Sequence, residues 1–400
     1  MSVLATAFDV DAATRAYLAT FDGAARARSD AYFEGGYWLL LWDTVIGTGL
    51  AWALLQFGIA ARLSAWARRM TGGRKFLTAL LWALAFLALY TLLQLPWSFY
   101  ESYLREHQYA MSNQDFGQWG LDFLKGTVIG LPLGALVIAV LTIFVRRALQ
   151  TWWLWGAGIV AIVVTISVAL GPVLIEPLFN DYKPMAASPL RNDILKVARA
   201  NGVPVTNVYV VDQSRQTKRI SANVAGLGST ARVALNDNLL NARDDPATLS
   251  VMGHETGHYA LNHIVLIIPF FALLAMAGFA VVQFGVPALI RANPRWRVDG
   301  VTDPAAIAVA VIILTVFFFV LTPLTNSFTR FQESQADIFG LNAARAPDGF
   351  ARSAIRLGQY RKLEPTPFEE FVFFDHPSGY ARIHMAMQWK AEHLGEPGIR

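Results

Sequence analysis

Two histidines and a glutamate stand together in the segment His254-Glu255-Thr256-Gly257-His258, which has the form H-E-x-x-H. On a helix, residues four apart share one face, with their Cβ atoms roughly 6 Å apart. Two imidazoles at that spacing can bind one zinc ion through nitrogens about 2.0–2.1 Å from the metal. Glu255 is set off that face, where its carboxylate can reach a zinc-bound water. The pattern therefore predicts metal-dependent hydrolysis with Glu255 as the general base.

A catalytic zinc ion takes three protein ligands and leaves one position for water, so a third ligand must come from elsewhere in the chain. Glu333, the first residue of the segment ESQAD, is the best candidate. Two apolar segments between His258 and Glu333 can cross a membrane and return, which brings Glu333 back to the level of the histidines. Asp337 follows one helical turn later and can accept a hydrogen bond from a ligand imidazole. We therefore expect one Zn²⁺ per chain, held by His254, His258 and Glu333.

Three further polar residues are candidates for contacts with a substrate. His376 and Arg382 lie in the C-terminal segment DHPSGYARI, and either could stabilise the oxyanion that forms when a peptide carbonyl is attacked. Residues 221–228 are expected to form an edge strand that holds an extended peptide by strand addition. Asn223 in this strand could hydrogen-bond the substrate. We expect the remaining histidines to be structural: His107, His263, His384 and His393.

The segments around these residues are those of a membrane protein. Hydrophobic residues make up 54% of the 400-residue chain and charged ones 16%, whereas soluble domains carry about 25% charged residues. The chain has no cysteine, which excludes disulfides and thiolate zinc sites. The net charge of +4 does not indicate nucleic-acid binding, because the basic residues gather at the ends of apolar runs. Six runs reach the roughly 20 residues needed to cross a bilayer: 37–61, 78–99, 121–145, 152–175, 264–290 and 306–329.

The polar region before the fifth apolar run is expected to be α/β. Residues 189–201 have a helical pattern, and 207–213, 221–228 and 230–237 read as strands with a turn near Gly228. Asp244 or Asp245 is placed as the N-cap, and Pro246 as the first residue, of the helix that carries the H-E-x-x-H motif.

These elements give a division into five regions. The predicted boundaries are 1–36 for an N-terminal surface segment with an amphipathic helix at 12–33, 37–175 for four membrane spans, 176–262 for an α/β zinc-peptidase domain, 263–329 for a transmembrane hairpin, and 330–400 for the C-terminal part of the peptidase domain.

Several segments in the same order resemble the type I CAAX prenyl protease family of integral-membrane zinc metallopeptidases, over residues 90–385. LPWSFYESYLREHQYAMSN (95–113) resembles the family's LPWxxYxxFxxExxxGFN loop, and IEPLFNDYKPM (175–185) its IAPLFxxxxPL segment. NVYVVDQSRQTKRISANVAGLG (207–228) resembles VYVVxxSxRSxHSNAYFxG. FQESQADIFG (331–340) resembles FExQAD, and DHPSGYARI (375–383) resembles HPPxxxRI.

The resemblance implies a polytopic α-helical membrane protein that encloses a chamber, with a small α/β gluzincin-like peptidase domain. It implies a zinc endopeptidase acting on prenylated or other membrane-associated peptides. It assigns the metal to His254, His258 and Glu333, catalysis to Glu255, and a supporting position to Asp337. It also implies that Asn223, His376 and Arg382 contact the substrate or the oxyanion.

Two features depart from the family. Members have seven spans, whereas six are counted here, with a seventh possible. The family's HSNAYF reads Ile220-Ser221-Ala222-Asn223-Val224-Ala225, which lacks the histidine and the aromatics and bears on prenyl-peptide specificity.

The arginines between spans favour an extracytoplasmic catalytic end by the positive-inside rule, whereas the family places it in the cytoplasm.

Two alternative functions remain open. A heat-shock-type membrane quality-control protease would share the zinc core, but the 95–113 segment argues against it. A non-catalytic chamber that binds lipidated peptides would need no intact zinc motif. We expect an integral multi-pass membrane protein with a peptide or lipidated peptide and membrane lipids as its partners, and the complete ligand set requires no second chain.

Overall fold

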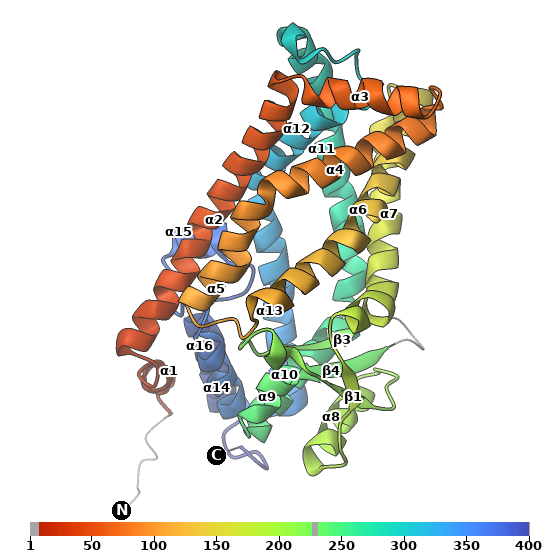
Figure 1. The fold of residues 1–400 in the computed structure, drawn as a ribbon. Helices are drawn as coiled ribbons and strands as arrows, with labels where there is room; N and C mark the ends of the chain where they lie inside the picture. The colour runs from red at the N-terminus through yellow and green to blue at the C-terminus, as the bar shows by residue number, and fades with distance from the viewer. Residues whose placement is uncertain (1–7, 226–230, 400) are drawn as a thin grey trace, which may run out of the picture.

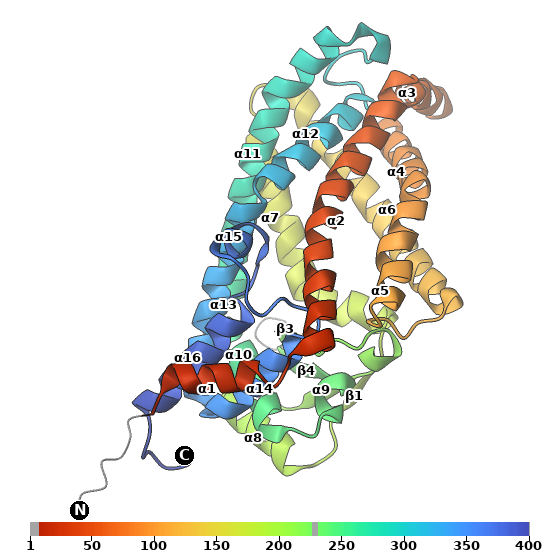
Figure 2. The ribbon, with the colours of Figure 1, turned by 90° about the vertical axis from the view of Figure 1, so that its left-hand side faces the viewer.

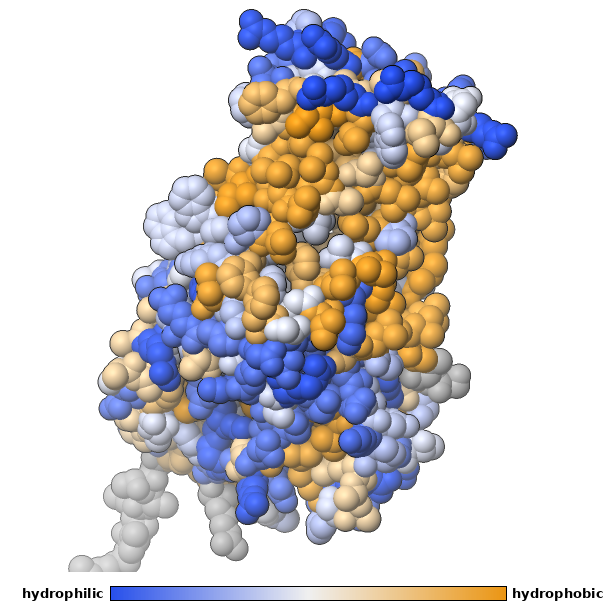
Figure 3. Space-filling view, in the orientation of Figure 1, coloured by the Kyte–Doolittle hydropathy of each residue, from blue (hydrophilic) through white to orange (hydrophobic). Residues whose placement is uncertain are grey.

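A computed structural model describes residues 8–225 and 231–399 of the chain. Long helices stand side by side at one end of the molecule, and a small sheet with shorter helices forms the other end (Figure 1). The surface carries a broad apolar band between two polar ends (Figure 3). This distribution is that of a protein whose middle lies in lipid and whose ends meet water.

Five helices are long and apolar enough to cross a membrane, and the bent pair α12–α13 makes a sixth span if its two helices are counted as one. Five of the six predicted spans are confirmed, the predicted span at 306–329 corresponds to the bent pair, and the part of the chain that the structure describes contains no seventh. The spans are α2 (Gly23–Gln56), α4 (Lys75–Phe99) continued by the π-helical η1 (Tyr100–Leu104) and α5 (Arg105–Gln108), α6 (Phe116–Arg147), α7 (Trp152–Leu170) continued by η2 (Gly171–Ile175) and η3 (Glu176–Leu178), α11 (His263–Ala292), and α12 (Ala306–Val320) with α13 (Thr322–Ala344).

The spans close into a ring. Each packs against the next in the order α2, α4, α6, α7, α11 and α12, and α12 packs back against α2 (Figure 2). Helix α3 (Ile59–Met70) lies across the end of the ring remote from the sheet. Near the sheet, α2, η1, α5, α6 and the loops at 111–114 and 216–219 line an open cleft of about 1130 Å³, including its mouth. The ring is thus the chamber-enclosing arrangement that the sequence predicts.

The polar end contains a four-stranded sheet in the order β1-β2-β4-β3, in which β2 and β4 are parallel and β3 forms an antiparallel edge. Two of the predicted strands extend into residues 226–230, which lie outside the described residues together with the predicted turn. The observed elements are β1 (Tyr182–Pro184), α8 (Pro189–Ala200), β2 (Val208–Val211), η4 (Gln213–Arg215), β3 (Ala222–Ala225), β4 (Arg232–Asn236), α9 (Asp237–Asn241) and α10 (Asp245–Ala260). The predicted helix at 189–201 corresponds to α8.

The C-terminal helices pack beside α10, and the N-terminus returns to them. α14 (Pro347–Leu357) packs on α10 and on α16 (Gly379–Glu392), while α15 (Pro367–Phe373) contacts α13. α1 (Val10–Leu18) lies on α16, and α2 begins only four residues after α1 ends. The single amphipathic helix expected over 12–33 is therefore two helices, of which the second is the start of a span.

The last span bends where it leaves the membrane ring. α12 and α13 meet at Leu321 with a 52° bend. Pro323, in the first turn of α13, has no N–H to continue the hydrogen bonds of α12. The bend directs α13 onto α10, the helix of the H-E-x-x-H motif, and these two helices form the most extensive helix pair in the molecule.

Candidate metal centre and active site

Glycines on both helices let α10 and α13 approach closely. A Cβ atom added to Gly253 would lie 3.0 Å from the carbonyl oxygen of Gly340, and one added to Gly340 would lie 2.7 Å from the backbone nitrogen of His254. Gly257 faces Phe339 and Ala336 in the same way. Because no side chain separates the backbones here, Glu333 on α13 reaches the two histidines on α10.

The start of α10 is fixed by its cap. Asp244, one of the two predicted candidates, is the N-cap and accepts a hydrogen bond from the backbone N–H of Ala247 at 3.1 Å. Arg352 on α14 donates two hydrogen bonds to the same carboxylate, at 2.6 and 2.9 Å. Pro246 stands at the second rather than the first position of the helix, which begins at Asp245.

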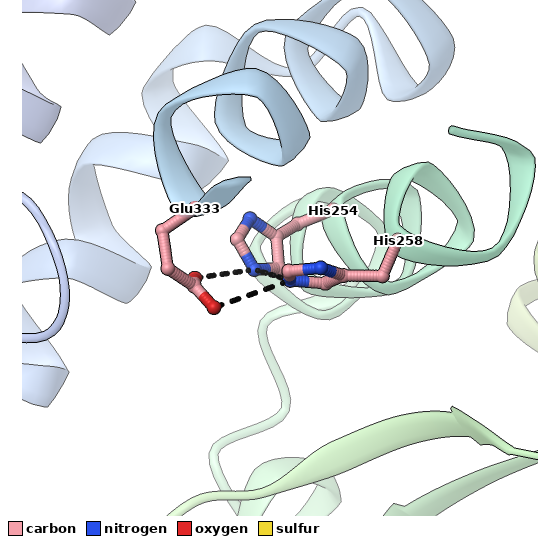
Figure 4. Close-up of side chains that lie close together, drawn as sticks. All are labelled: His254, His258 and Glu333. Atoms are coloured by element: carbon pink, nitrogen blue, oxygen red, sulfur yellow. Dashed lines mark hydrogen bonds and ion pairs between the residues drawn. The ribbon is translucent and has the colours of Figure 1, made fainter. Parts of the chain in front are cut away.

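His254, His258 and Glu333 converge at one point, with one ligand atom from each lying within 4.8 Å of the others (Figure 4). The two Nε2 atoms are 3.1 Å apart. Glu333 lies 3.1 Å from His254 Nε2 through Oε2 and 3.3 Å from His258 Nε2 through Oε1. Ligands bound at about 2.0–2.1 Å in a tetrahedron stand roughly 3.3 Å apart. The three side chains therefore have the spacing of ligands around one zinc ion.

The tautomer of His254 follows from its partner. Its Nδ1 lies 2.7 Å from Oδ1 of Asp337, a carboxylate that is fully buried. Because the ionised carboxylate can only accept, a proton is on Nδ1, and in the neutral, metal-binding form of His254 the Nε2 atom presents a lone pair to Glu333 and His258. Asp337 thus holds His254 in the form that binds a metal.

His258 is oriented by a histidine that the sequence reasoning set aside as structural. Nδ1 of His258 lies 3.0 Å from Nδ1 of His263, whose Nε2 lies 3.2 Å from the side-chain oxygen of Gln335. If His263 donates through Nε2 to that amide oxygen, its Nδ1 accepts from His258, and Nε2 of His258 is also a bare lone pair. His263, which is 2% exposed, therefore contacts the metal centre through His258.

When both histidines are neutral, these contacts place lone pairs and negative charge around one point. Two facing Nε2 lone pairs cannot hydrogen-bond to each other. Oε2 of the buried Glu333 accepts no hydrogen bond from any described residue, although two imidazoles lie near it. A cation between the three groups satisfies all of them, so the donor set fits a zinc ion.

The electrostatics of the centre favour a cation. Burial favours neutral His254, but the hydrogen bonds and charges of Asp337 and Glu333 outweigh it and raise the pKa of His254 to about 10. Burial likewise opposes ionisation of Glu333, yet His254 and His258 hold the pKa of Glu333 well below its ordinary value. The field that favours an imidazolium here also favours a divalent metal ion.

Glu255 faces a cavity of about 740 Å³ beside the three converging side chains. Within the described residues its carboxylate has no hydrogen bond or ion pair, unlike Glu333 and Asp337. Burial raises the pKa of Glu255. A carboxylate that has no other partner and whose pKa is raised is a stronger proton acceptor than an ordinary carboxylate, as a general base requires.

His376 and Arg382 also line this cavity. Nδ1 of His376 lies 2.8 Å from Oδ1 of Asp375, and its Nε2 lies 3.3 Å from Oε2 of Glu333. Arg382 donates to Oδ1 of Asp337 at 2.5 Å, while its Nε has no partner among the described residues. The guanidinium of Arg382 therefore hydrogen-bonds to the carboxylate that orients His254.

The edge strand β3 reaches the cavity through residues other than the one expected. Ala222 in β3 and Ser221 just before the strand line the cavity, whereas Asn223 does not. Oδ1 of Asn223 is buried and accepts no hydrogen bond from residues 8–225 or 231–399. Tyr360 lines the cavity as well and donates to the carbonyl of Ile220 at 3.3 Å. No motif in the sequence marks Tyr360.

The chain matches two adjoining family descriptions that together span nearly all of it. Residues 15–181 match "CAAX prenyl protease N-terminal, five membrane helices", and residues 184–390 match "Peptidase family M48". In this chain the first match contains four spans, α2, α4, α6 and α7.

Curated relatives carry related names. The "Uncharacterized metalloprotease YhfN" of Bacillus subtilis is 27% identical over 349 residues, which cover 85% of this chain and 81% of the relative. The "CAAX prenyl protease 1 homolog" of Arabidopsis thaliana is 28% identical, with 64% of this chain and 60% of the relative covered. The "CAAX prenyl protease 1" of Saccharomyces cerevisiae is 30% identical over 186 residues, 46% of this chain and 41% of the relative.

The fold is also found in a solved structure. The crystal structure of S. mikatae Ste24p superposes with a TM-score of 0.72, covers 94% of each chain, and is 18% identical in sequence. The M48 match covers more than half of the chain and includes all three converging side chains. The protein belongs to peptidase family M48 and is an integral, multi-pass zinc metallopeptidase of the membrane.

Proposed function

We propose that the chain is an endopeptidase whose zinc ion is held by His254, His258 and Glu333, with Glu255 as general base. The observation that carries the proposal is the convergence of these three side chains within 4.8 Å beside a cavity that Glu255 lines. Residues 176–262 and 330–400 together supply the peptidase part, and the hairpin 263–329 connects them.

A bound zinc ion would act as a Lewis acid on the peptide carbonyl and lower the pKa of the attacking water. Glu255 takes the proton of that water as it attacks the carbonyl carbon, and then delivers it to the amide nitrogen as the C–N bond breaks. His376, when protonated, donates through Nε2 to the oxyanion. Arg382 keeps Asp337 ionised and thereby keeps the Nδ1 proton on His254.

The substrate is proposed to be a peptide that enters the ring, with a lipidated or other membrane-associated peptide as the specific class. The ring, the unfilled space within it and the names of the plant and yeast relatives support this choice. Among the described residues β3 is an edge strand beside the cavity, so an extended peptide can join its outer side by strand addition. Asn223 in β3 is proposed to contact the bound peptide.

The test is zinc content and peptide cleavage by the detergent-purified protein, with a prenylated and an unprenylated version of the same peptide. We expect about one zinc per chain in the wild type, retention of zinc without cleavage in Glu255→Gln, and loss of zinc in Glu333→Ala. Cleavage of both peptides at equal rates would refute a lipid requirement while leaving the peptidase intact. If Glu255→Gln cleaved as fast as the wild type, the catalytic assignment would be wrong and a binding chamber would take its place.

A further inference from the structure

The end of the ring remote from the metal centre carries a strong positive charge. Ten basic residues and two acidic ones in 57–75, 146–151 and 291–305 give this end +8, whereas the whole chain carries +4, so the remainder carries −4. This polar end stands above the apolar band in Figure 3. We call its basic residues the arginine cap: Arg62, Arg68, Arg69, Arg74, Lys75, Arg146, Arg147, Arg291, Arg295 and Arg297.

Most of this charge is not neutralised within the protein. Arg68 pairs with Asp303 at 2.9 Å and with Asp299 at 3.3 Å. Within residues 8–225 and 231–399, the other nine cap residues have no carboxylate within 4.0 Å. All cap residues except the half-buried Arg146 are exposed. The surface is therefore open to an anionic partner.

The position of α3 puts this charge at a membrane surface. The helix crosses the end of the ring and buries Ala60, Ser64 and Ala67 against it (Figure 1). Phe57 precedes the helix and Met70 is its last residue, and their side chains are 69% and 66% exposed. Exposed apolar residues next to arginines are typical of helices that lie in the headgroup region of a bilayer.

An apolar cavity opens beneath the cap. α6, α11 and α12 line about 1010 Å³ of unfilled space, including its mouth, with apolar side chains such as Leu141, Val286 and Ala310. Arg146 stands at its rim, because its guanidinium donates to the carbonyl of Thr302, one of the lining residues, at 3.2 Å. A cation over an apolar cavity matches an anionic headgroup with a hydrocarbon chain.

The acidic residue in the cavity wall does not oppose an anion. Asp303 accepts hydrogen bonds from Ser64 at 2.6 Å and from the backbone N–H of Ala305 at 3.0 Å, in addition to its ion pair with Arg68. Its charge is thus compensated within the fold.

The cavity is separate from the peptidase site. Its lining residues on α11 begin at Phe279, 16 residues after His263, and end at Val286, 23 residues after it. At 1.5 Å per residue, these positions are about 24–34 Å from the metal centre along the helix. A lipid group attached next to a scissile bond cannot reach so far, so the occupant is not the tail of a bound substrate.

We propose that this end of the ring binds an anionic phospholipid of the surrounding bilayer, with one acyl chain in the cavity and the phosphate against Arg146 and Arg147. The other residues of the arginine cap attract anionic headgroups of the same leaflet by their charge, without a defined binding site. The site is independent of the proposed catalysis.

The experiment measures binding of phosphatidylglycerol and of phosphatidylcholine to delipidated full-length protein by native mass spectrometry. Arg146→Gln/Arg147→Gln removes the two protein charges proposed to bind the headgroup. Glutamine at position 146 can still donate a hydrogen bond to Thr302. Ala310→Trp fills the cavity. Lys183→Gln/Lys196→Gln removes two exposed charges at the sheet end as a matched control.

We expect the wild type to prefer phosphatidylglycerol. The double arginine variant should bind it about 25-fold more weakly, at about fivefold per cation, and Ala310→Trp should bind both lipids more weakly. The lysine control should match the wild type. Equal binding of the two lipids by the wild type, or unchanged phosphatidylglycerol binding in the double arginine variant, would overturn the proposal whatever the outcome of the peptidase tests.

Discussion

Removal of the His263 imidazole tests whether this residue orients the zinc ligand His258. In His263→Leu, the Nδ1–H of His258 loses its acceptor at 3.0 Å. His263 is 2% exposed, so water has little access to replace it. An unsatisfied buried donor costs about 1–3 kcal/mol, and the loss of such a partner weakens metal binding by about 10–100-fold. We expect a zinc Kd 10–100-fold higher than in the wild type.

The assay is a zinc titration of the purified protein in competition with a chelator, together with thermal unfolding of the metal-free form. His263→Asn retains an oxygen acceptor on a shorter side chain and should recover part of the affinity. His384→Leu, on α16, serves as the control histidine and should bind zinc as the wild type does.

Two results would refute the reasoning. Unchanged zinc affinity in His263→Leu would mean that the contact between the two imidazoles does not orient His258. Equal losses in His263→Leu and His263→Asn, together with equal losses of thermal stability in the metal-free proteins, would mean that packing rather than the hydrogen bond is responsible.

Three further predictions concern the helices around the site and the orientation of the chain. Gly340→Ala would place a Cβ 2.7 Å from the backbone of α10, and we expect it to lose about 1–3 kcal/mol of stability and to bind zinc more weakly. In the control Gly36→Ala, the added Cβ would meet nothing within 4 Å, so this variant should match the wild type in stability and in zinc binding. The pKa of Asp244 is held below its ordinary value of 3.8, chiefly by the hydrogen bond from its arginine partner, so its stabilisation is present above that value and lost as the pH falls through the lowered pKa. Asp244→Asn keeps the cap and should flatten the acid side of the profile of thermal midpoint against pH. The chain has no cysteine, so a single introduced cysteine reports which side of the membrane it lies on. If the arginine-rich end is cytoplasmic, a membrane-impermeant thiol reagent on intact cells should label Lys183→Cys and not Arg69→Cys. The reverse pattern would show that the catalytic end is cytoplasmic.

The parts of the fold that follow local rules were predictable from the sequence. The six spans follow from apolar length, and α8 and α10 follow from periodicity and capping residues. The meeting of Glu333 with the histidines was predictable because an antiparallel hairpin returns the chain to the same level. The close approach of α10 and α13 was not, because it depends on Gly253, Gly257 and Gly340 facing one another across two helices.

The role of His263 was missed for a specific physical reason. On one continuous helix, a residue five positions after His258 lies off the ligand face. In the structure, α10 ends at Ala260, and Asn262 adopts a left-handed conformation with φ of 55° before α11 begins at His263. The turn carries His263 back to His258. For Arg382, the sequence predicted a position near the site but not the hydrogen bond to Asp337. That hydrogen bond depends on how α16 packs.

The metal centre and the membrane ring are parts of one structure. α10 passes into α11 through two residues, and α12 passes into α13 through the single bend at Leu321. The helices that carry the two histidines and the glutamate are therefore positioned by the hairpin α11–α12, which is itself packed into the ring. A shift or rotation of α12 against α11 would move Glu333 relative to His254 and His258, because only Leu321 separates α12 from the helix that carries Glu333. The ring thus determines the ligand geometry of the metal centre.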